Sequence, residues 1–266
     1  MTSATTDIAT HARDLLRHRM QGMPIPLAGR PPLDIERGYA TQDEADYILR
    51  TERGFELIGY KVAAANPIAR SRLNLTEPFH GRMYRQMASA SPAILPCPAG
   101  FFQAYEPEIA IRIGRDLDPA SAPFTAAVIE SATDAVLPAI ELVGTWYTPW
   151  TEAGAANLIA DNAAFGHWIM GEAVTDWSAL DLLDAPVSLS IDGTVVATGT
   201  GRAVDGGAFG AAAWLANALA RRGRVLRAGE YITTGSVTAP HPVGIGQHAI
   251  ADFGRLGTIS LTMKAG

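Results

Sequence analysis

From residue 56 onward, the chain consists of short apolar runs with β-strand character, separated by glycine and proline residues. Residues 187–191 alternate apolar and polar side chains ahead of Asp192-Gly193, a pattern typical of a tight β-hairpin. Residues 259–263 alternate in the same way. Because few helical segments separate these runs, a doubly wound parallel sheet is excluded. The sequence predicts one mixed α/β, largely β domain over residues 56–266, and its 48% hydrophobic residues suffice for a sizeable core.

The first 55 residues follow a helical pattern instead. Apolar residues recur at helical spacing over residues 7–20, and a second helix is expected over 35–52, after a connector rich in proline and glycine. We therefore expect an N-terminal helical segment, residues 1–55, ahead of the largely β domain. Within that domain, Asn66-Pro67 has the form of a helix start, and an Ala/Leu-rich helix is expected over 208–222.

Charge and composition exclude several classes of protein. The 21 Lys and Arg residues against 27 Asp and Glu give a net charge of -6 without a basic run, so a nucleic-acid partner is not expected. No apolar stretch is long enough for a membrane span, and the N-terminus lacks the apolar block of a signal peptide. The single cysteine, Cys97, fits a reducing compartment, so we expect a cytoplasmic protein.

Two glutamates occupy unusual positions in the strand-like run of residues 101–115. Because residues two apart in a strand project to the same face, Glu106 and Glu108 should point the same way. Pro107 between them cannot donate a ladder hydrogen bond, which predicts a sheet edge or a bulge. Two parallel carboxylates repel each other unless a cation lies between them, and a hard divalent ion prefers oxygen ligands. A solvated strand face with two ordinary glutamates is the alternative.

Two further charged residues are isolated within apolar runs. Glu141 is the only charge in residues 135–144, and a lone buried carboxylate costs several kcal/mol unless it is paired or coordinated. If its strand lies beside the one with Glu106, three carboxylates converge on one metal. Lys61 is the only charge in LIGYKVAAA. A desolvated lysine with a lowered pKa could act as an acid or base, or it could anchor a carboxylate; snorkelling from a strand end is the alternative.

These residues stand in short motifs that together resemble the 2-keto-4-pentenoate hydratase and 4-oxalocrotonate decarboxylase family, which belongs to the fumarylacetoacetate hydrolase fold superfamily. The resemblance covers nearly the whole chain and is specific through the order and spacing of the motifs. The motifs are Gly59-Tyr60-Lys61-Val62, Glu106-Pro107-Glu108-Ile109-Ala110, Pro138-Ala139-Ile140-Glu141, Ile159-Ala160-Asp161-Asn162-Ala163, Ala213-Trp214-Leu215-Ala216, Leu226-Arg227-Ala228-Gly229-Glu230, Thr234-Gly235-Ser236 and Leu256-Gly257-Thr258-Ile259.

The resemblance implies a fumarylacetoacetate hydrolase-like domain and assigns roles to individual residues. It implies catalytic roles for Lys61 and Asp161, with Asn162 helping to form the pocket and Gly235-Ser236 close to the substrate carboxylate. It places the ligands of Mg²⁺ or Mn²⁺ on Glu106, Glu108 and Glu141. Such an ion chelates the oxygen at C2 and the C1 carboxylate of a small 2-oxo acid and stabilises an enolate.

The chain departs from the family pattern at several polar positions. Phe79 stands where many hydratases carry an aspartate, and the neighbouring His80 is the residue that could take its place, so His80 is expected among the substrate-binding residues. Alanines stand at 63–65 and at 164 where the family has Gly-Leu-Thr and a small hydroxyl residue, and Gly207-Ala208 replaces a His-Pro pair. The metal set is intact, whereas groups that position water or substrate are missing.

Three functions follow from the resemblance. The first is a metal-dependent lyase that hydrates a short 2-hydroxy-2,4-dienoate. The second is a decarboxylase of the 4-oxalocrotonate type, which Phe79 and the Gly81-Arg82-Met83 motif favour. The third is a non-catalytic partner subunit, which would have no need of three converging carboxylates. In each case we expect a homo-oligomer, with a related lyase as a further partner.

Overall fold

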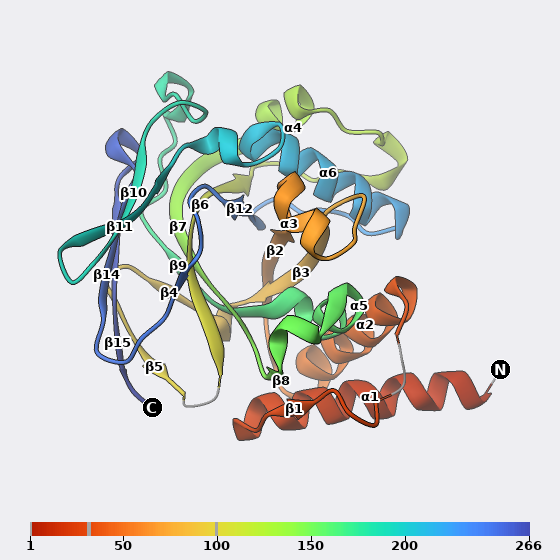
Figure 1. Cartoon of the computed structure of the whole chain (residues 1–266). Coiled ribbons are helices and arrows are strands. Elements are labelled where there is room, and N and C mark those ends of the chain that lie inside the picture. The colour runs from red at the N-terminus through yellow and green to blue at the C-terminus, as the bar shows by residue number, and fades with distance from the viewer. Residues whose placement is uncertain (1, 31–32, 99–100) are drawn as a thin grey trace.

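The computed structural model describes residues 2–30, 33–98 and 101–266, which form three sheets and the helices around them (Figure 1). The largest sheet has the strand order β3-β2-β12-β6-β7-β9-β4, and β13 also pairs with β6. Its strands are β2 (Leu57–Ala63), β3 (Phe79–Tyr84), β4 (Ala88–Ala90), β6 (Phe102–Ile113), β7 (Thr133–Thr145), β9 (Phe165–Met170), β12 (Tyr231–Ser236) and β13 (His241–Pro242).

A second sheet has the order β11-β10-β14-β15-β5, and β1 pairs with β8 in a small third one. These strands are β1 (Ile25–Pro26), β5 (Ala93–Cys97), β8 (Tyr147–Thr148), β10 (Val187–Ile191), β11 (Thr194–Gly199), β14 (His248–Asp252) and β15 (Thr258–Ala265). The main core lies between the two large sheets and α6, whose apolar residues form one buried cluster. The mixed, largely β architecture that the sequence predicts is therefore confirmed.

The α-helices are α1 (Thr2–Gln21), α2 (Ile35–Glu52), α3 (Pro67–Arg72), α4 (Ala126–Ala132), α5 (Gly154–Ala160) and α6 (Gly207–Arg221). The short 3-10 turns are η1 (Arg85–Met87), η2 (Pro119–Ser121), η3 (Trp150–Glu152), η4 (Asn162–Ala164), η5 (Trp177–Ala179), η6 (Gly201–Ala203) and η7 (Gly254–Leu256). None of the helices in the described part of the chain is long and apolar enough to cross a membrane.

Local sequence signals predicted several of these elements. α2 has the predicted bounds, and the Asp34 side chain caps it by accepting a hydrogen bond from the backbone N–H of Arg37 at 2.8 Å. The Asn66 side chain caps α3 in the same way, as the Asn66-Pro67 pair predicts. β10 and β11 form the predicted hairpin, and both turn residues, Asp192 and Gly193, have positive φ angles.

The N-terminal helices pack against the β domain rather than standing apart from it. α1 contacts α2, and α2 contacts α5, beside the large sheet (Figure 1). The Gln42 amide of α2 donates to the carbonyls of His80 and Ile159 at 3.0 and 2.8 Å. The expected boundary between residues 55 and 56 falls in the short connection from α2 to β2. A separate helical segment over residues 1–55 stays a prediction.

The strand that carries Pro107 is central in the sheet. β6 pairs with β12 on one side and β7 on the other, so the sheet-edge expectation is wrong. An irregularity does lie beside Pro107, but the extra residue is in the partner strand, because the register of β12 against β6 shifts between Thr233 and Ser236. Val237 N–H donates to the Pro107 carbonyl at 2.8 Å across this irregularity. The missing N–H of the proline therefore faces the place where the ladder is already interrupted.

Candidate metal centre and active site

Three carboxylates converge on one face of the large sheet. Glu106 of β6 lies directly opposite Glu141 of β7 in the antiparallel ladder, and Glu108 follows two residues later on the same face. Each of the three side chains offers a carboxylate oxygen, and these oxygens all lie within 4.8 Å of one another. Alternation along β6 and the pairing of β6 with β7 together produce this cluster.

The carboxylate cluster is deeply placed, which alters its ionisation. Glu108 and Glu141 are buried, and Glu106 is half-buried. Burial, opposed by Lys61 and reinforced by Glu141, raises the pKa of Glu106 to about 7. Burial and the two neighbouring carboxylates raise the pKa of Glu108 well above its usual range. Burial likewise raises the pKa of Glu141, although Lys61 acts in the opposite direction. Without a cation beside them, simultaneous ionisation of the three carboxyl groups is therefore unfavourable.

Lys61 reaches this cluster from β2. Its Nζ lies 2.8 Å from Glu141 Oε1 and donates to the carbonyl of Ala163 at 3.1 Å. Two strands separate β2 from β7 in the sheet order, so the sheet must curl strongly for these groups to meet. Burial lowers the pKa of Lys61, but the carboxylates of Glu141 and Glu106 outweigh it and raise that pKa. The lowered pKa that isolation among apolar residues suggested is therefore wrong in the metal-free cluster.

Glu108 is held in place by groups from β12. Thr233 Oγ1 donates to Glu108 Oε2 at 2.5 Å, and Gly235 N–H donates to the same oxygen at 2.8 Å. Ser236 lies opposite Glu108 in the ladder, and its hydroxyl donates to the Thr238 carbonyl at 2.9 Å. Thus the Gly235 N–H and the Ser236 hydroxyl, expected near the substrate, already have partners within the protein.

These features fit a divalent cation. Carboxylate oxygens from three glutamates suit a hard ion such as Mg²⁺. Proteins usually bind this ion through a small number of carboxylates, and water or substrate fills its remaining coordination positions. Among the described residues, Glu141 Oε2 is buried without a hydrogen-bond partner. A buried acceptor in this state favours a cation beside it. Both donors to Glu108 bind one oxygen, so the Glu108 carboxylate is oriented by groups behind it.

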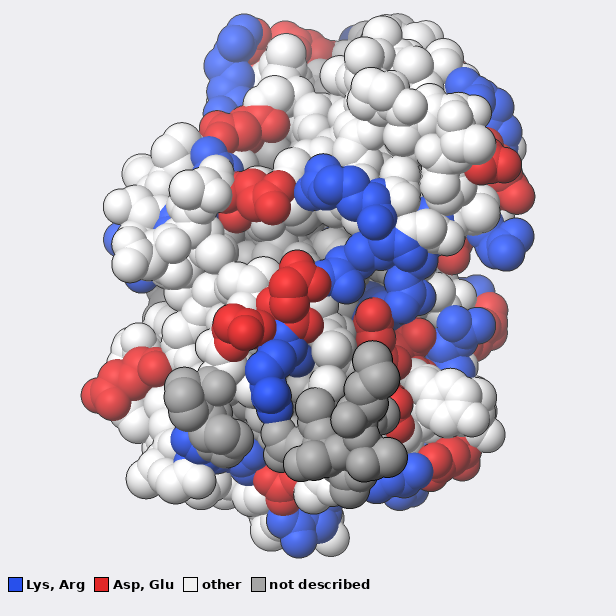
Figure 2. Space-filling model, turned by 90° about the vertical axis from the view of Figure 1, so that its right-hand side faces the viewer, with Lys and Arg blue, Asp and Glu red and all other residues white. Residues whose placement is uncertain are grey.

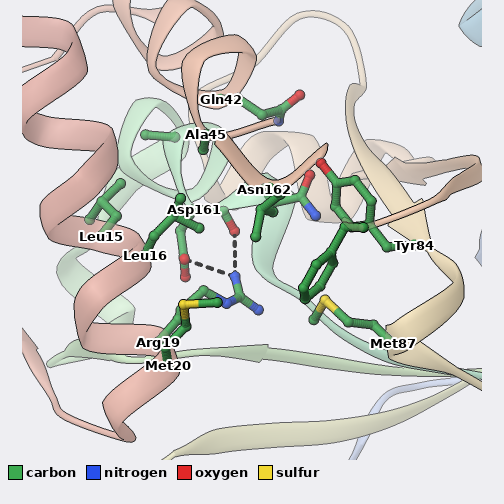
Figure 3. Close-up of a pocket in the computed structure, with 13 residues that line it drawn as sticks. Leu15, Leu16, Arg19, Met20, Gln42, Ala45, Tyr84, Met87, Asp161 and Asn162 are labelled. Atoms are coloured by element: carbon green, nitrogen blue, oxygen red, sulfur yellow. Dashed lines mark hydrogen bonds and ion pairs between the residues drawn. The ribbon is translucent and has the colours of Figure 1, made fainter. Parts of the chain in front are cut away.

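Asp161 and Asn162 lie at the end of α5 and bind other protein groups. Arg19 of α1 contacts the Asp161 carboxylate at 2.8 Å (Figure 3), and Thr145 Oγ1 donates to the other carboxylate oxygen at 2.7 Å. The Asn162 amide forms two hydrogen bonds with the backbone of Arg82 in β3. Both side chains border an apolar pocket of about 210 Å³ between α1 and α2, apart from the carboxylate cluster.

His80 is not brought to the carboxylates. It lies opposite Val62 in the ladder of β2 and β3, whereas Lys61 lies opposite Gly81, so His80 projects to the other face. Its ring packs 4.8 Å from that of Tyr39. Burial, together with Arg82 and Arg222, lowers the pKa of His80 to about 3. The substrate-binding role expected for His80 does not fit this placement, because the adjacent residue in a strand faces away from the site.

The departures from the family pattern gather on the side of the sheet that carries Lys61. Phe79 pairs with Ala63, two residues beyond Lys61, and both belong to one buried apolar cluster with Ala163 and Ala164. Apolar groups therefore stand together where the family has several polar ones. This clustering could not be seen from the sequence, because residues 63, 79 and 164 are far apart in it.

Two residues that hold the site together carry no recognisable signal in the sequence. Thr233 resembles any strand threonine, and its role depends on β12 lying between β2 and β6. Arg19 is one of many arginines, and its contact with Asp161 depends on how α1 docks. Gly81 could have been noticed as a glycine within a strand, where it often marks a close approach of backbones. A Cβ at Gly81 would lie 2.4 Å from the Asn162 carbonyl oxygen.

Solved structures define the class of protein to which the chain belongs. 4-Oxalocrotonate decarboxylase from Pseudomonas putida G7, complexed with magnesium and adipate, aligns with a TM-score of 0.91 at 23% identity over 97% of both chains. Fumarylpyruvate hydrolase from Pseudomonas aeruginosa, in complex with Mn²⁺ and pyruvate, aligns with a TM-score of 0.62 over 79% of this chain and 90% of its own. The chain thus has the fumarylacetoacetate hydrolase fold.

Sequence relatives identify the family within that class. No protein-family model matches the chain. It is 31% identical over 232 residues to 2-keto-4-pentenoate hydratase from Paraburkholderia xenovorans, covering 85% of this chain and 83% of the relative. It is also 31% identical over 215 residues to 2-hydroxyhexa-2,4-dienoate hydratase from Comamonas testosteroni, covering 80% of each. The chain belongs to the 2-keto-4-pentenoate hydratase family, as its motifs predict.

Proposed function

We propose that this chain is a divalent-metal-dependent hydratase, a carbon-oxygen lyase that adds water to a short 2-hydroxy-2,4-dienoate. The observation that carries this proposal is the convergence of Glu106, Glu108 and Glu141 beside buried Lys61. The hydratase names of relatives at 31% identity over most of the chain support the same reaction. A non-catalytic partner subunit would not require such a costly group of buried charges.

The three glutamates would hold Mg²⁺ or Mn²⁺. When bound, the ion supplies a Lewis acid for the C2 oxygen and C1 carboxylate of the substrate. Protonated Lys61 would give its Nζ proton to C5 of the dienol and take back the proton of the 2-hydroxyl group, which converts the dienol to a conjugated enone. Water then adds across the enone. Phe79, Ala63 and Ala164 keep that side of the site apolar.

Decarboxylation of a 4-oxalocrotonate-type substrate is the second candidate. Phe79 favours it, because a phenyl ring cannot handle a proton for the activation of water, and decarboxylation needs no such water. The P. putida G7 decarboxylase has a closely similar fold. In that reaction the two electrons of the broken carbon–carbon bond pass into the same enolate system as CO₂ leaves.

The deciding experiment follows the ultraviolet absorbance of freshly generated 2-hydroxypenta-2,4-dienoate, with products identified by mass. We expect loss of the dienol with gain of one water, dependent on Mg²⁺ or Mn²⁺ and abolished by EDTA. Glu106→Gln should abolish turnover, whereas Glu130→Gln, on the exposed side of α4, should not. CO₂ release from 2-oxohex-3-enedioate without hydration would establish the decarboxylase. If neither substrate is turned over and the protein binds no divalent metal, the non-catalytic partner subunit would be favoured.

Assembly and location are parts of the same proposal. A homo-oligomer is expected from the family resemblance, and the exposed isoleucines Ile68, Ile94 and Ile245 are residues that a subunit contact could cover. The predicted association with a related lyase and a cytoplasmic location remain proposals. On the face in Figure 2, basic and acidic side chains are interspersed. Arg224, after α6, pairs with Asp43 of α2 at 2.9 Å. Light scattering during size-exclusion chromatography would give the subunit number.

A further inference from the structure

The turn that follows α5 has an unusual backbone. Asn162, Ala163 and Ala164 have φ angles of 55°, 56° and 55°, so three consecutive residues are left-handed and none is glycine. L-residues avoid this conformation because Cβ crowds the following carbonyl, and a run of three is rarer still. Such a backbone persists only when its surroundings hold it in place, and these held segments concentrate at functional sites.

Asn162 fixes the turn to strand β3. Its Oδ1 accepts a hydrogen bond from the Arg82 N–H at 2.7 Å, and its Nδ2 donates to the Arg82 carbonyl at 2.8 Å. The side-chain amide thereby satisfies both polar groups of one residue in the strand. The turn can approach so closely because its neighbour in β3 is Gly81, which lies directly opposite Lys61 in the ladder.

Arg19 holds the two ends of the same turn from α1. Its guanidinium donates to the Asp161 carbonyl at 3.0 Å and pairs with the Asp161 carboxylate (Figure 3). It also donates to the Phe165 carbonyl. Thr145 of β7 binds the remaining carboxylate oxygen. The turn is therefore tied to α1, β3 and β7 at once.

One backbone group of this turn points at the site. The Ala163 carbonyl accepts a hydrogen bond from Lys61 Nζ at 3.1 Å, and Glu141 provides the other contact of the ammonium group. Lysine has a flexible stem, and its rotamers must be restricted by such contacts before Nζ has a fixed position. The carbonyl would point elsewhere if residues 162–164 relaxed to a right-handed or extended backbone.

We propose that Asn162 is a positioning residue that acts on Lys61 through the Ala163 carbonyl and does not touch substrate. The expected effect of Asn162 on turnover rests on the proposed function. Its effect on the position of Lys61 Nζ rests only on the geometry of the turn. It replaces the substrate-binding role that the family resemblance implied for Asn162.

The kinetic test compares Asn162→Gly with wild type. Glycine tolerates a left-handed backbone but removes the link to Arg82, so the turn loses its clamp without new strain. We expect kcat to fall by about 10- to 100-fold, the size of effect that a displacement of about 1 Å can produce, while KM changes less than about twofold. Asn162→Asp keeps the acceptor for the Arg82 N–H and loses the donor, so it should be intermediate.

Asn157→Ala is the matched control. The Asn157 side chain of α5 donates to the Ala153 carbonyl and accepts from the Tyr147 hydroxyl. Its link to the turn, from the Asp161 N–H to the Asn157 carbonyl, is a backbone hydrogen bond that the alanine variant keeps. This variant should keep both kinetic constants near the wild-type values. A rise in KM with unchanged kcat in Asn162→Gly would mean that Asn162 binds substrate, and it would overturn the inference.

A second readout needs no turnover. The chain has only two lysines, Lys61 and the exposed Lys264, so acylation of each by acetic anhydride can be followed by mass spectrometry. Asn162→Gly should increase modification of Lys61 several-fold relative to Lys264, and Asn157→Ala should not. Unchanged labelling would overturn the inference even if the dienoate proves not to be a substrate, whereas increased labelling without any turnover would refute only the proposed function.

Discussion

Lys61 Nζ lies 2.8 Å from Glu141 Oε1, and both side chains are buried on strands that have two other strands between them. The pair forms only because the sheet curls. The positive charge of Lys61 offsets part of the negative charge of the three carboxylates. A buried ion pair contributes little net stability, yet removal of one partner leaves a charge that is expensive to keep out of water.

Lys61→Met tests this balance. The variant removes the ammonium group and leaves Glu141 beside two carboxylates, so the metal-free protein should lose about 3–5 kcal/mol of unfolding free energy. Mg²⁺ or Mn²⁺ should restore most of this loss, because an ion that binds only the folded state stabilises it. Turnover should remain at least about 100-fold below wild type. Thermal denaturation with EDTA or with the ions measures the first two effects.

The control is Lys264→Met, which changes an exposed residue of β15 and should alter stability by less than about 0.5 kcal/mol. If divalent ions fail to raise the melting temperature of Lys61→Met, the three carboxylates do not share an ion.

Thr233→Val tests the group that orients Glu108. Valine keeps the shape of threonine but removes the hydrogen bond of 2.5 Å to Glu108 Oε2. Loss of a group that orients a metal ligand should weaken divalent-ion affinity by about 10- to 100-fold, as measured by isothermal titration calorimetry. Thr234→Val is the matched control, because Thr234 donates to the Ile109 carbonyl and not to a carboxylate. Equal losses in both variants would contradict the assignment.

His80 should make the protein sensitive to acid. Its pKa is lowered to about 3 in the folded state, so between pH 6.5 and 3 the unfolded chain binds the proton and the folded chain does not. Stability from this group is present above pH 6.5 and is lost as the pH falls, by about 2 kcal/mol between pH 7 and pH 5. His80→Leu should flatten that part of the curve of unfolding free energy against pH. A slope equal to that of wild type would show that His80 is not the group responsible.

Gly81→Ala tests the close contact between β3 and the turn at residues 162–164. The added Cβ would lie 2.4 Å from the Asn162 carbonyl oxygen, so the turn must move. We expect a stability loss of about 1–3 kcal/mol and a fall in kcat. Gly54→Ala provides the comparison: among the described residues no atom lies within 4 Å of its added Cβ, but its φ of +69° makes alanine unfavourable by about 1–2 kcal/mol. It should lose stability and keep its activity.

The metal cluster was predictable because its signals are local. Glu106 and Glu108 share a face through the two-residue period of a strand, and Glu141 is conspicuous as the single charge of an apolar run. The three carboxylates converge only if β6 pairs with β7 in the register that places Glu106 opposite Glu141. The sequence alone could not establish that pairing.

The supporting groups depended on long-range arrangement. Thr233 binds Glu108 only because β12 joins the sheet between β2 and β6. Arg19 pairs with Asp161 only because α1 packs where Arg19 reaches the end of α5. His80 shows the reverse error: its neighbour in sequence stands at a family acid position, but one step along a strand turns a side chain to the opposite face.

The parallel pairing of β2 with β12, with Lys61 opposite Thr233, also sets the order in which the site can be built. The lysine strand emerges early in synthesis, but the strand that connects it to the glutamates emerges only after residue 230. Contacts between such distant segments are slow to form, since a long loop must close before they stabilise anything. A nascent chain that ends before β12 could pair β6 with β7 and so gather the three glutamates, but it would lack the strand that places Lys61 beside them.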